Sequence, residues 1–188
     1  MNKAFFLDRD GVINVDHGHV GSVKEFDFIE GVFGACRKIN ELGFKIIIVT
    51  NQAGIARGYY TEEDFNTLTN WMIGEFEQND VKIDDVFYCP HHPEKGNGKY
   101  LRDCQCRKPN PGMILDAAEK HKLNLNLSVL VGDKVSDILA AERAGLGETY
   151  LINSKYLTTE QSKVYDSLRH VVEEFECSSI RAKLENKK

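Results

Sequence analysis

The chain has 188 residues, of which 41% are hydrophobic and 28% are charged, as in an ordinary soluble globular protein. Its net charge is −5 and it has no long basic stripe, which argues against nucleic acid as a partner. No apolar run is long enough to span a membrane, and the N-terminus lacks the pattern of a signal peptide. We therefore expect a single cytoplasmic domain over residues 1–188, without a membrane partner.

Strand-like apolar runs alternate with amphipathic helical patterns along the chain. Strands are predicted at 4–7, 44–50, 83–89, 128–132 and 149–152. Helices are predicted at 31–43, 61–78, 109–122, 135–145 and around 166–176. Thr61 is the expected N-cap of the second helix, and Pro111 is expected in the first turn of the third. This order predicts an α/β fold, a three-layer sandwich around a mostly parallel, Rossmann-like sheet.

Polar residues follow several of these strands directly, and parallel sheets bind ligands beyond the carboxyl ends of their strands. The residues are Asp8, Asp10, Thr50, Asn51, Gly132 and Asp133. Arg9 is expected to point to the opposite side of an extended chain, so that Asp8 and Asp10 share a face. The three converging acids would repel one another, and Mg²⁺ relieves such repulsion. With the cation of Lys108 nearby, the cluster is suited to a phosphoryl group.

Four potential metal ligands gather in a polar loop at about 89–106. They are Cys89, His91, Cys104 and Cys106. One Cys-x-His and one Cys-x-Cys pair can surround a structural, tetrahedral Zn²⁺, with His92 as an alternative to His91. A disulfide is disfavoured, because three cysteines leave one over and the cytosol is reducing. Burial of apolar side chains could not order so polar a loop, so the metal would order it. The metal would also fix the positions of Arg107 and Lys108, which follow Cys106 directly.

Access to this site is expected to be open. Neither the roughly twenty residues after Asp10 nor the stretch from Asn51 to Arg107 has room for a large cap domain, because folded domains have at least ~50 residues. The fold is therefore predicted to carry a zinc-binding loop but no large cap.

Four segments, "DRDGV", "TNQ", "RKPNPG" and "GDKVSD", resemble in this order the four signatures of the haloacid dehalogenase superfamily of phosphohydrolases, over roughly residues 4–152. More narrowly, "NVDHGHV", "TNQAGIARGYYTEEDF", "YCPHHP" and "CQCRKPNPGM" are similar to the D-glycero-D-manno-heptose-1,7-bisphosphate 7-phosphatase family. The resemblance implies a Mg²⁺-dependent phosphatase that removes the C7 phosphate through an aspartyl-phosphate. It would act in the biosynthesis of nucleotide-activated heptose for lipopolysaccharide or a related glycan.

By this resemblance Asp8 is the nucleophile and Asp10 the acid–base group. Mg²⁺ would be held by Asp8, the carbonyl of Asp10 and Asp133, and structural Zn²⁺ by the Cys/His set. The residues expected to bind the small-molecule sugar bisphosphate are Asp16, His17, Gly18, His19, Thr50, Asn51, Gln52, Ala53, Arg57, Arg107, Lys108 and Lys134. We expect the protein to be a monomer.

Two alternatives remain at this point. One is a histidinol-phosphatase or another phosphomonoesterase of the same zinc-loop group, which shares the first motif, the zinc loop and "CRKP" but tends to have "TNQDGLG" and "GDR". The other is a catalytically idle, zinc-stabilised binding module. Every acid that catalysis requires is present, which argues against the second alternative.

Overall fold

A computed structural model describes residues 2–158 and 163–185 of the chain. Residues 1, 159–162 and 186–188 lie outside the described part. The expectation of one domain over residues 1–188 includes them and stays a prediction.

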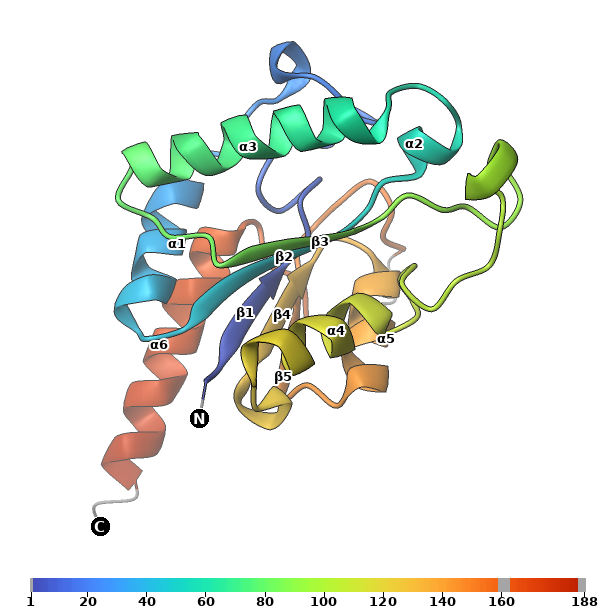
Figure 1. Cartoon of the computed structure of the whole chain (residues 1–188). Coiled ribbons are helices and arrows are strands. Elements are labelled where there is room, and N and C mark those ends of the chain that lie inside the picture. The colour runs from blue at the N-terminus through green and yellow to red at the C-terminus, as the bar shows by residue number, and fades with distance from the viewer. Residues whose placement is uncertain (1, 159–162, 186–188) are drawn as a thin grey trace.

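The centre of the molecule is a five-stranded parallel sheet (Figure 1). Its strands are β1 (Ala4–Leu7), β2 (Lys45–Asn51), β3 (Asp85–Cys89), β4 (Val129–Gly132) and β5 (Glu148–Leu151), in the spatial order β3-β2-β1-β4-β5. Leu7 pairs with Ile48 on one side and Val131 on the other. The end of β1 therefore lies in the middle of the carboxyl edge, between the ends of β2 and β4.

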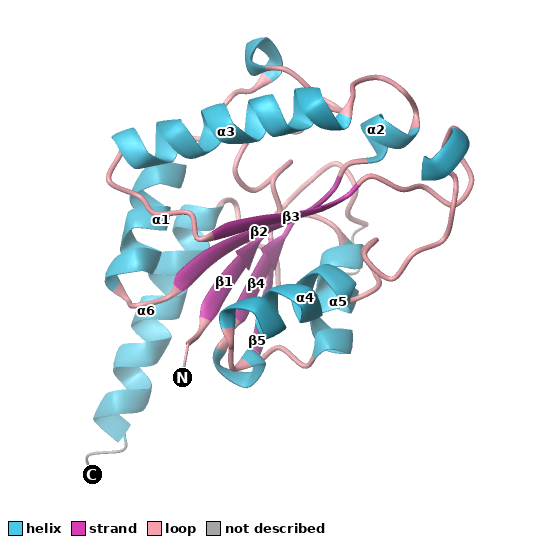
Figure 2. Ribbon diagram, in the orientation of Figure 1, coloured by secondary structure: helices cyan, strands magenta, loops and turns pink. Residues whose placement is uncertain are grey.

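Helices cover both faces of the sheet, which makes the predicted three-layer sandwich (Figure 2). The helices are α1 (Val32–Glu41), α2 (Ala53–Ala56), α3 (Glu62–Gln78), α4 (Gly112–His121), α5 (Val135–Ala144) and α6 (Leu168–Glu185). α1, α3 and α6 pack on one face, and α4 and α5 pack on the other. The α/β fold predicted from the sequence is confirmed.

Alternation of side chains along the strands divides the core into two halves. Phe5 and Leu7 face α1, α3 and α6, whereas Phe6 faces α4 and α5. All three side chains are fully buried. Burial of one such side chain contributes roughly 1.5–3 kcal/mol. A strand that is apolar throughout is therefore the expected sequence for a sheet that is covered on both faces.

The boundaries differ from the prediction at a few places. The short helix α2 was not predicted, because its four residues are too few to show a helical period. Pro111 is the N-cap of α4 and not part of its first turn, so that prediction is wrong by one position. α6 continues to Glu185, beyond the predicted end near 176, and extends past the sheet (Figure 1). The Thr61 cap is confirmed, and Asp64 completes a capping box.

The described residues contain no large cap. Between β1 and α1 the chain forms a loop with one 3₁₀ turn at Val23–Glu25, and between β3 and α4 a loop with another at Gly98–Tyr100. Within residues 2–158 and 163–185, no helix is long and apolar enough to cross a membrane.

We predict that Leu68→Ala in α3 destabilises the protein by about 2–5 kcal/mol, because Leu68 is fully buried and the change leaves a cavity. Leu115→Ala in α4 is the matched control. Leu115 is exposed, so its truncation should change the free energy of unfolding by less than about 0.5 kcal/mol. Urea unfolding of both variants measures the difference, and equal losses would contradict the packing described here.

Candidate active site

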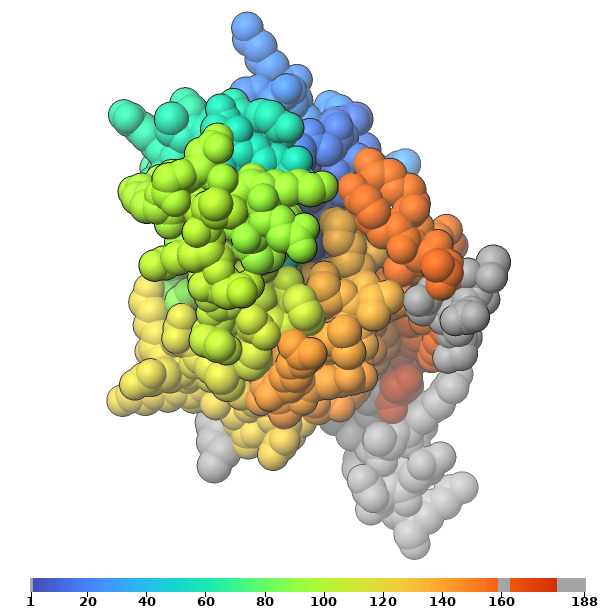
Figure 3. Space-filling model, turned by 90° about the vertical axis from the view of Figure 1, so that its right-hand side faces the viewer, coloured from blue at the N-terminus to red at the C-terminus, as the bar shows by residue number. Residues whose placement is uncertain are grey.

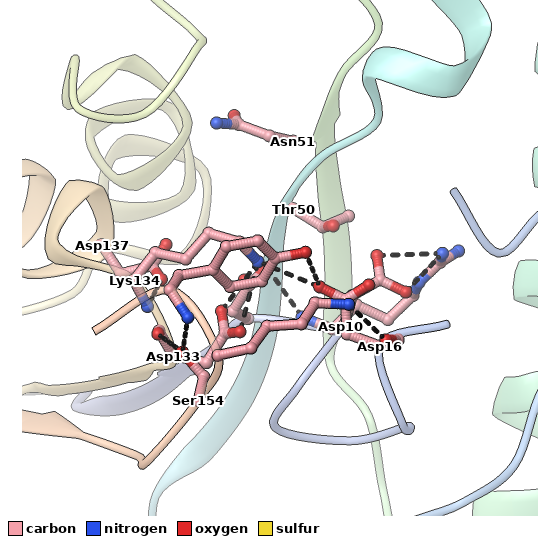
Figure 4. Close-up of polar contacts among 12 residues, drawn as sticks. Asp10, Asp16, Thr50, Asn51, Asp133, Lys134, Asp137 and Ser154 are labelled. Carbon is pink, nitrogen blue, oxygen red and sulfur yellow. Dashed lines mark hydrogen bonds and ion pairs between the residues drawn. The ribbon is translucent and has the colours of Figure 1, made fainter. Parts of the chain in front are cut away.

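A cavity of about 400 Å³ opens at the carboxyl edge of the sheet. Segments from distant parts of the sequence gather on this face, among them the loops after β1, β3 and β5 (Figure 3). The predicted site residues that line the cavity are Asp8, Asp10, Asp16, Gly18, His19, Asn51, Gln52, Ala53, Arg107, Lys108 and Lys134. Figure 4 shows the polar contacts among part of this set, with Thr50 and Asn51 at the end of β2.

Three buried carboxylates converge beside this cavity. Oxygens of Asp8, Asp133 and Asp137 lie within 4.8 Å of one another. Burial, followed by the negative charge of Asp8, raises the pKa of Asp133 to about 7. Such a set of hard oxygen ligands fits a divalent cation of the Mg²⁺ type, since a cation removes the repulsion that shifts Asp133. The side chain of Asp10 is not in this set, and Asp137 takes the place that the sequence predicted for it.

Two lysines neutralise part of this negative charge. The Lys108 ammonium lies 3.0 Å from Asp8, 2.6 Å from Asp137 and 2.7 Å from the Val49 carbonyl. Burial by itself would lower the pKa of Lys108, but Asp137 and Asp8 raise it overall. The Lys134 ammonium lies 3.0 Å from Asp133, and its pKa is raised, against burial, by the charges of Asp8 and Asp133. Both side chains are therefore held as cations at the cavity.

Two glycines allow the acidic segments to approach so closely. Gly11 has φ +91°, and a Cβ there would lie 2.4 Å from a carboxylate oxygen of Asp133. A Cβ on Gly132 would lie 2.3 Å from Cβ of Asp137. Asp137 in turn accepts a hydrogen bond from the backbone N–H of Lys134 at 2.9 Å, so it caps α5 while it pairs with Lys108.

Asp10 is held by three neighbouring side chains. Its two oxygens accept hydrogen bonds from Arg9 (2.9 and 3.1 Å), Asn14 (3.0 Å) and Gln52 (3.1 Å). As expected, Asp8 and Asp10 line the cavity and Arg9 does not. The chain is not extended beyond Leu7, however, and the guanidinium of Arg9 still reaches the Asp10 carboxylate.

Four residues of the predicted site do not line the cavity. Asp133 lies beneath it as part of the carboxylate cluster. Thr50 is fully buried, and its hydroxyl accepts a hydrogen bond from Gln52 at 2.8 Å. His17 instead pairs with Asp27 at 2.7 Å. Arg57 does not line the cavity either; burial lowers the pKa of His19, and the charge of Arg57 lowers it further.

Sequence reasoning missed two tyrosines at the cavity. Tyr60 donates a hydrogen bond to Gln52, and Tyr156 donates one to Asp16 at 2.9 Å. Tyr156 belongs to the segment after β5, where Ser154 also donates to the carbonyl of Asp133 at 2.6 Å. The rule that ligands bind beyond strand ends applies to β5 as well and would have identified this segment.

The four predicted zinc ligands form a compact cluster beside the cavity. The sulfur of Cys106 lies 3.1 Å from those of Cys89 and Cys104, and 3.5 Å from Nδ1 of His91. Ligands at about 2.0–2.3 Å from one Zn²⁺ ion lie within about 4 Å of one another, so the set fits tetrahedral zinc. None of the described cysteines forms a disulfide. The hydrogen bond between Cys89 and Cys106 and the other cluster contacts lower the pKa of Cys106 to about 5, against the effect of burial, which favours a thiolate ligand.

The structure also distinguishes the two histidines. Nδ1 of His92 accepts hydrogen bonds from the backbone N–H groups of Glu94 and Lys95. His91 is the residue that lies in the cluster. The Arg107 guanidinium donates to the carbonyl of His91 at 3.1 Å, so the cluster is directly connected to a cation at the cavity.

Comparisons with known proteins agree with this geometry. Residues 105–175 match a family described as HAD-hydrolase-like. The chain is 49% identical to D-glycero-beta-D-manno-heptose-1,7-bisphosphate 7-phosphatase of Vibrio cholerae, with 89% of this chain and 93% of that protein covered. It is 48% identical to D-glycero-alpha-D-manno-heptose-1,7-bisphosphate 7-phosphatase of Burkholderia mallei, with 91% and 92% covered.

A solved structure is similar in fold. It is D,D-heptose 1,7-bisphosphate phosphatase from B. bronchiseptica, complexed with magnesium and phosphate. Its TM-score with this chain is 0.79 at 29% sequence identity, and the match covers 94% of this chain and 99% of that one.

We predict one bound Zn²⁺ per chain, which Cys106→Ser should release because it removes the central thiolate of the cluster. Cys177→Ser is the matched control, since Cys177 is exposed on α6 and away from the cluster. Elemental analysis of protein purified without added metal gives the zinc content of each variant. A wild-type protein without zinc would contradict the assignment.

Proposed function

Because this chain belongs to the D-glycero-D-manno-heptose-1,7-bisphosphate 7-phosphatase family of the haloacid dehalogenase superfamily, we propose that it removes the C7 phosphate of a heptose 1,7-bisphosphate. The observation that carries the proposal is the placement of Asp8 and Asp10 at a cavity that Lys108, Arg107 and Lys134 also line. The product would serve the biosynthesis of nucleotide-activated heptose. We propose a cytoplasmic monomer that consists of one domain.

The metal site proposed is the carboxylate cluster. Asp8, Asp133 and the carbonyl of Asp10 would hold Mg²⁺, and Asp137 would support the site through its contact with Lys108. The bound ion would neutralise the phosphoryl oxygens and orient them toward Asp8. Two anionic partners, a carboxylate and a phosphate, could not otherwise approach each other in so buried a site.

The chain's own residues would carry out the reaction in two steps. A carboxylate oxygen of Asp8 attacks phosphorus, and the sugar oxygen leaves with the proton that Asp10 donates. Asp10 then takes a proton from the water that hydrolyses the aspartyl-phosphate. Lys108 keeps Asp8 in place, because its ammonium bridges Asp8 and Asp137.

The second phosphate of the substrate would bind at the rim of the cavity. Arg107 lines the cavity and is oriented through the His91 carbonyl, and a planar guanidinium suits a phosphate that does not react. Asp16, Gly18 and His19 supply hydrogen-bonding groups on the opposite side of the cavity. His17, Thr50 and Arg57 do not line the cavity, so their contact with the substrate stays a prediction from the sequence.

The histidinol-phosphatase alternative is not favoured, because the similar relatives carry names of heptose-bisphosphate phosphatases. The idle binding module would leave the convergence of three buried acids without a purpose. A phosphate-release screen with Mg²⁺ tests all three readings, with both anomers of heptose 1,7-bisphosphate, sugar monophosphates and histidinol phosphate as substrates. Highest kcat/KM on a heptose bisphosphate supports the proposal, and release from none of them would overturn it.

We predict that Asp8→Asn abolishes phosphate release, because an amide is a very poor nucleophile and the covalent route is closed. Asp116→Asn is the matched control, since Asp116 is exposed on α4 and should retain full turnover. Steady-state assays of both variants, with thermal unfolding as a check on folding, give the answer. Near-normal turnover of Asp8→Asn would exclude the aspartyl-phosphate.

Arg107→Ala should lower kcat/KM for heptose 1,7-bisphosphate by about 10-fold or more, the loss expected for a charge-assisted hydrogen bond of ~1.5–3 kcal/mol. A small monophosphate should lose much less, because it has no second phosphate to bind. Arg102→Ala in the same loop is the control, as Arg102 is exposed and does not line the cavity. Equal losses of kcat/KM on both substrates would show that Arg107 does not read the second phosphate.

A further inference from the structure

Arg9, between the two catalytic carboxylates of the first motif, has an unusual environment. Its side chain is only 1% exposed, although it carries a full charge. The guanidinium lies 5.8 Å from the ring centre of Phe26 and 5.8 Å from that of Phe65. It is therefore enclosed by two aromatic rings on the side of the loop that faces the core.

The polar contacts of this buried cation are concentrated in one nitrogen. Nη2 donates to both oxygens of Asp10 and to the carbonyl of Val20 at 2.7 Å. Nε and Nη1 are buried and have no hydrogen-bond partner among the described residues. Burial of a cation with two unpaired donors costs stability, so a residue chosen for stability alone would be apolar here.

The contacts hold Asp10 from the side away from the cavity. The Asp10 side chain is 16% exposed and lines the cavity, whereas Arg9 does not line it. Asn14 and Gln52 each donate one hydrogen bond to Asp10. Tyr60 donates to the amide oxygen of Gln52 and so fixes the orientation of that amide. The amide nitrogen of Gln52 is thereby directed at Asp10.

We propose that Arg9 is a positioning residue that fixes the carboxyl group of Asp10 for proton transfer to the leaving oxygen. The inference rests on the proposed phosphatase function. Low polarity around the guanidinium strengthens its attraction to Asp10, and the link to Val20 ties the loop over the site to the same group. Arg9 itself does not line the cavity and is not part of the carboxylate cluster.

The proton that Asp10 donates speeds the reaction only for leaving groups that are strong bases. As the bond between phosphorus and the ester oxygen breaks, its electron pair moves to that oxygen, while a new bond forms to the carboxylate oxygen of Asp8. An oxygen that is a strong base needs the proton of Asp10 at this moment. A nitrophenolate departs without it, because its charge is already stabilised. Misplacement of Asp10 should therefore affect phenyl phosphate and spare p-nitrophenyl phosphate, which has nearly the same shape.

The test compares kcat/KM for these two esters in wild type, Arg9→Met and Asp10→Asn. Methionine retains an unbranched apolar stem between Phe26 and Phe65 and removes the charge. The parameter kcat/KM reports the steps up to formation of the aspartyl-phosphate and leaves its hydrolysis out. The ratio of the two values within one preparation does not depend on the fraction of folded enzyme.

We expect Arg9→Met to lower kcat/KM for phenyl phosphate about 10–100-fold and to change that for p-nitrophenyl phosphate less than about 3-fold, the pattern of impaired acid catalysis. Asp10→Asn should show the same pattern with a larger loss. Equal losses on both esters in Arg9→Met, or no loss on either, would overturn the inference. An Asp10→Asn variant with equal losses on both esters would instead overturn the acid role of Asp10, and a wild type that releases no phosphate from heptose 1,7-bisphosphate would overturn the proposed function.

Discussion

The repulsion among buried carboxylates is the constraint on which the rest of this site depends. Asp8, Asp133 and Asp137 are drawn together by strands and a helix that are fixed by the core, so they cannot separate to relieve it. Lys108 and Lys134 offset part of the charge in the described structure, and burial together with the charge of Asp8 still raises the pKa of Asp133. Binding of a cation lowers the free energy of such a site, so the affinity for a metal follows from the fold.

The topology of the sheet explains why three acids meet at one point. β1 is central, with β2 and β4 as its neighbours, and in a parallel sheet all three strands end at the same edge. Because motifs separated by more than a hundred residues follow β1 and β4, the meeting of Asp8 and Asp133 could be predicted from the sequence. The third acid of the cluster is Asp137 on α5, where the sequence predicted Asp10. Alternating apolar strands and amphipathic helices likewise indicated the two-sided core, which the structure confirms.

What could not be predicted depends on side-chain packing and not on period or spacing. The pairing of Arg9 with Asp10 takes place beside two aromatic rings, Phe26 and Phe65, that are distant in sequence. The burial of Thr50 and the pairing of His17 with Asp27 also follow from tertiary neighbours. The short helix α2 was beyond reach for another reason, because four residues carry too little pattern. The Cys/His cluster, by contrast, could be predicted from ligand type and spacing, since soft ligands are rare in a polar loop, although the choice of His91 over His92 came from the family resemblance.

The missing cap has a kinetic consequence. Enzymes that enclose their substrate with a second domain often release product only as fast as that domain reopens. Here the described residues that line the cavity lie in the loops that follow the strands and at the starts of α2 and α5. Turnover should then be insensitive to solvent viscosity beyond the diffusion of the sugar itself. Changes in the rim loops can alter which sugar is accepted without any change at the strand ends, so recognition and chemistry can evolve independently.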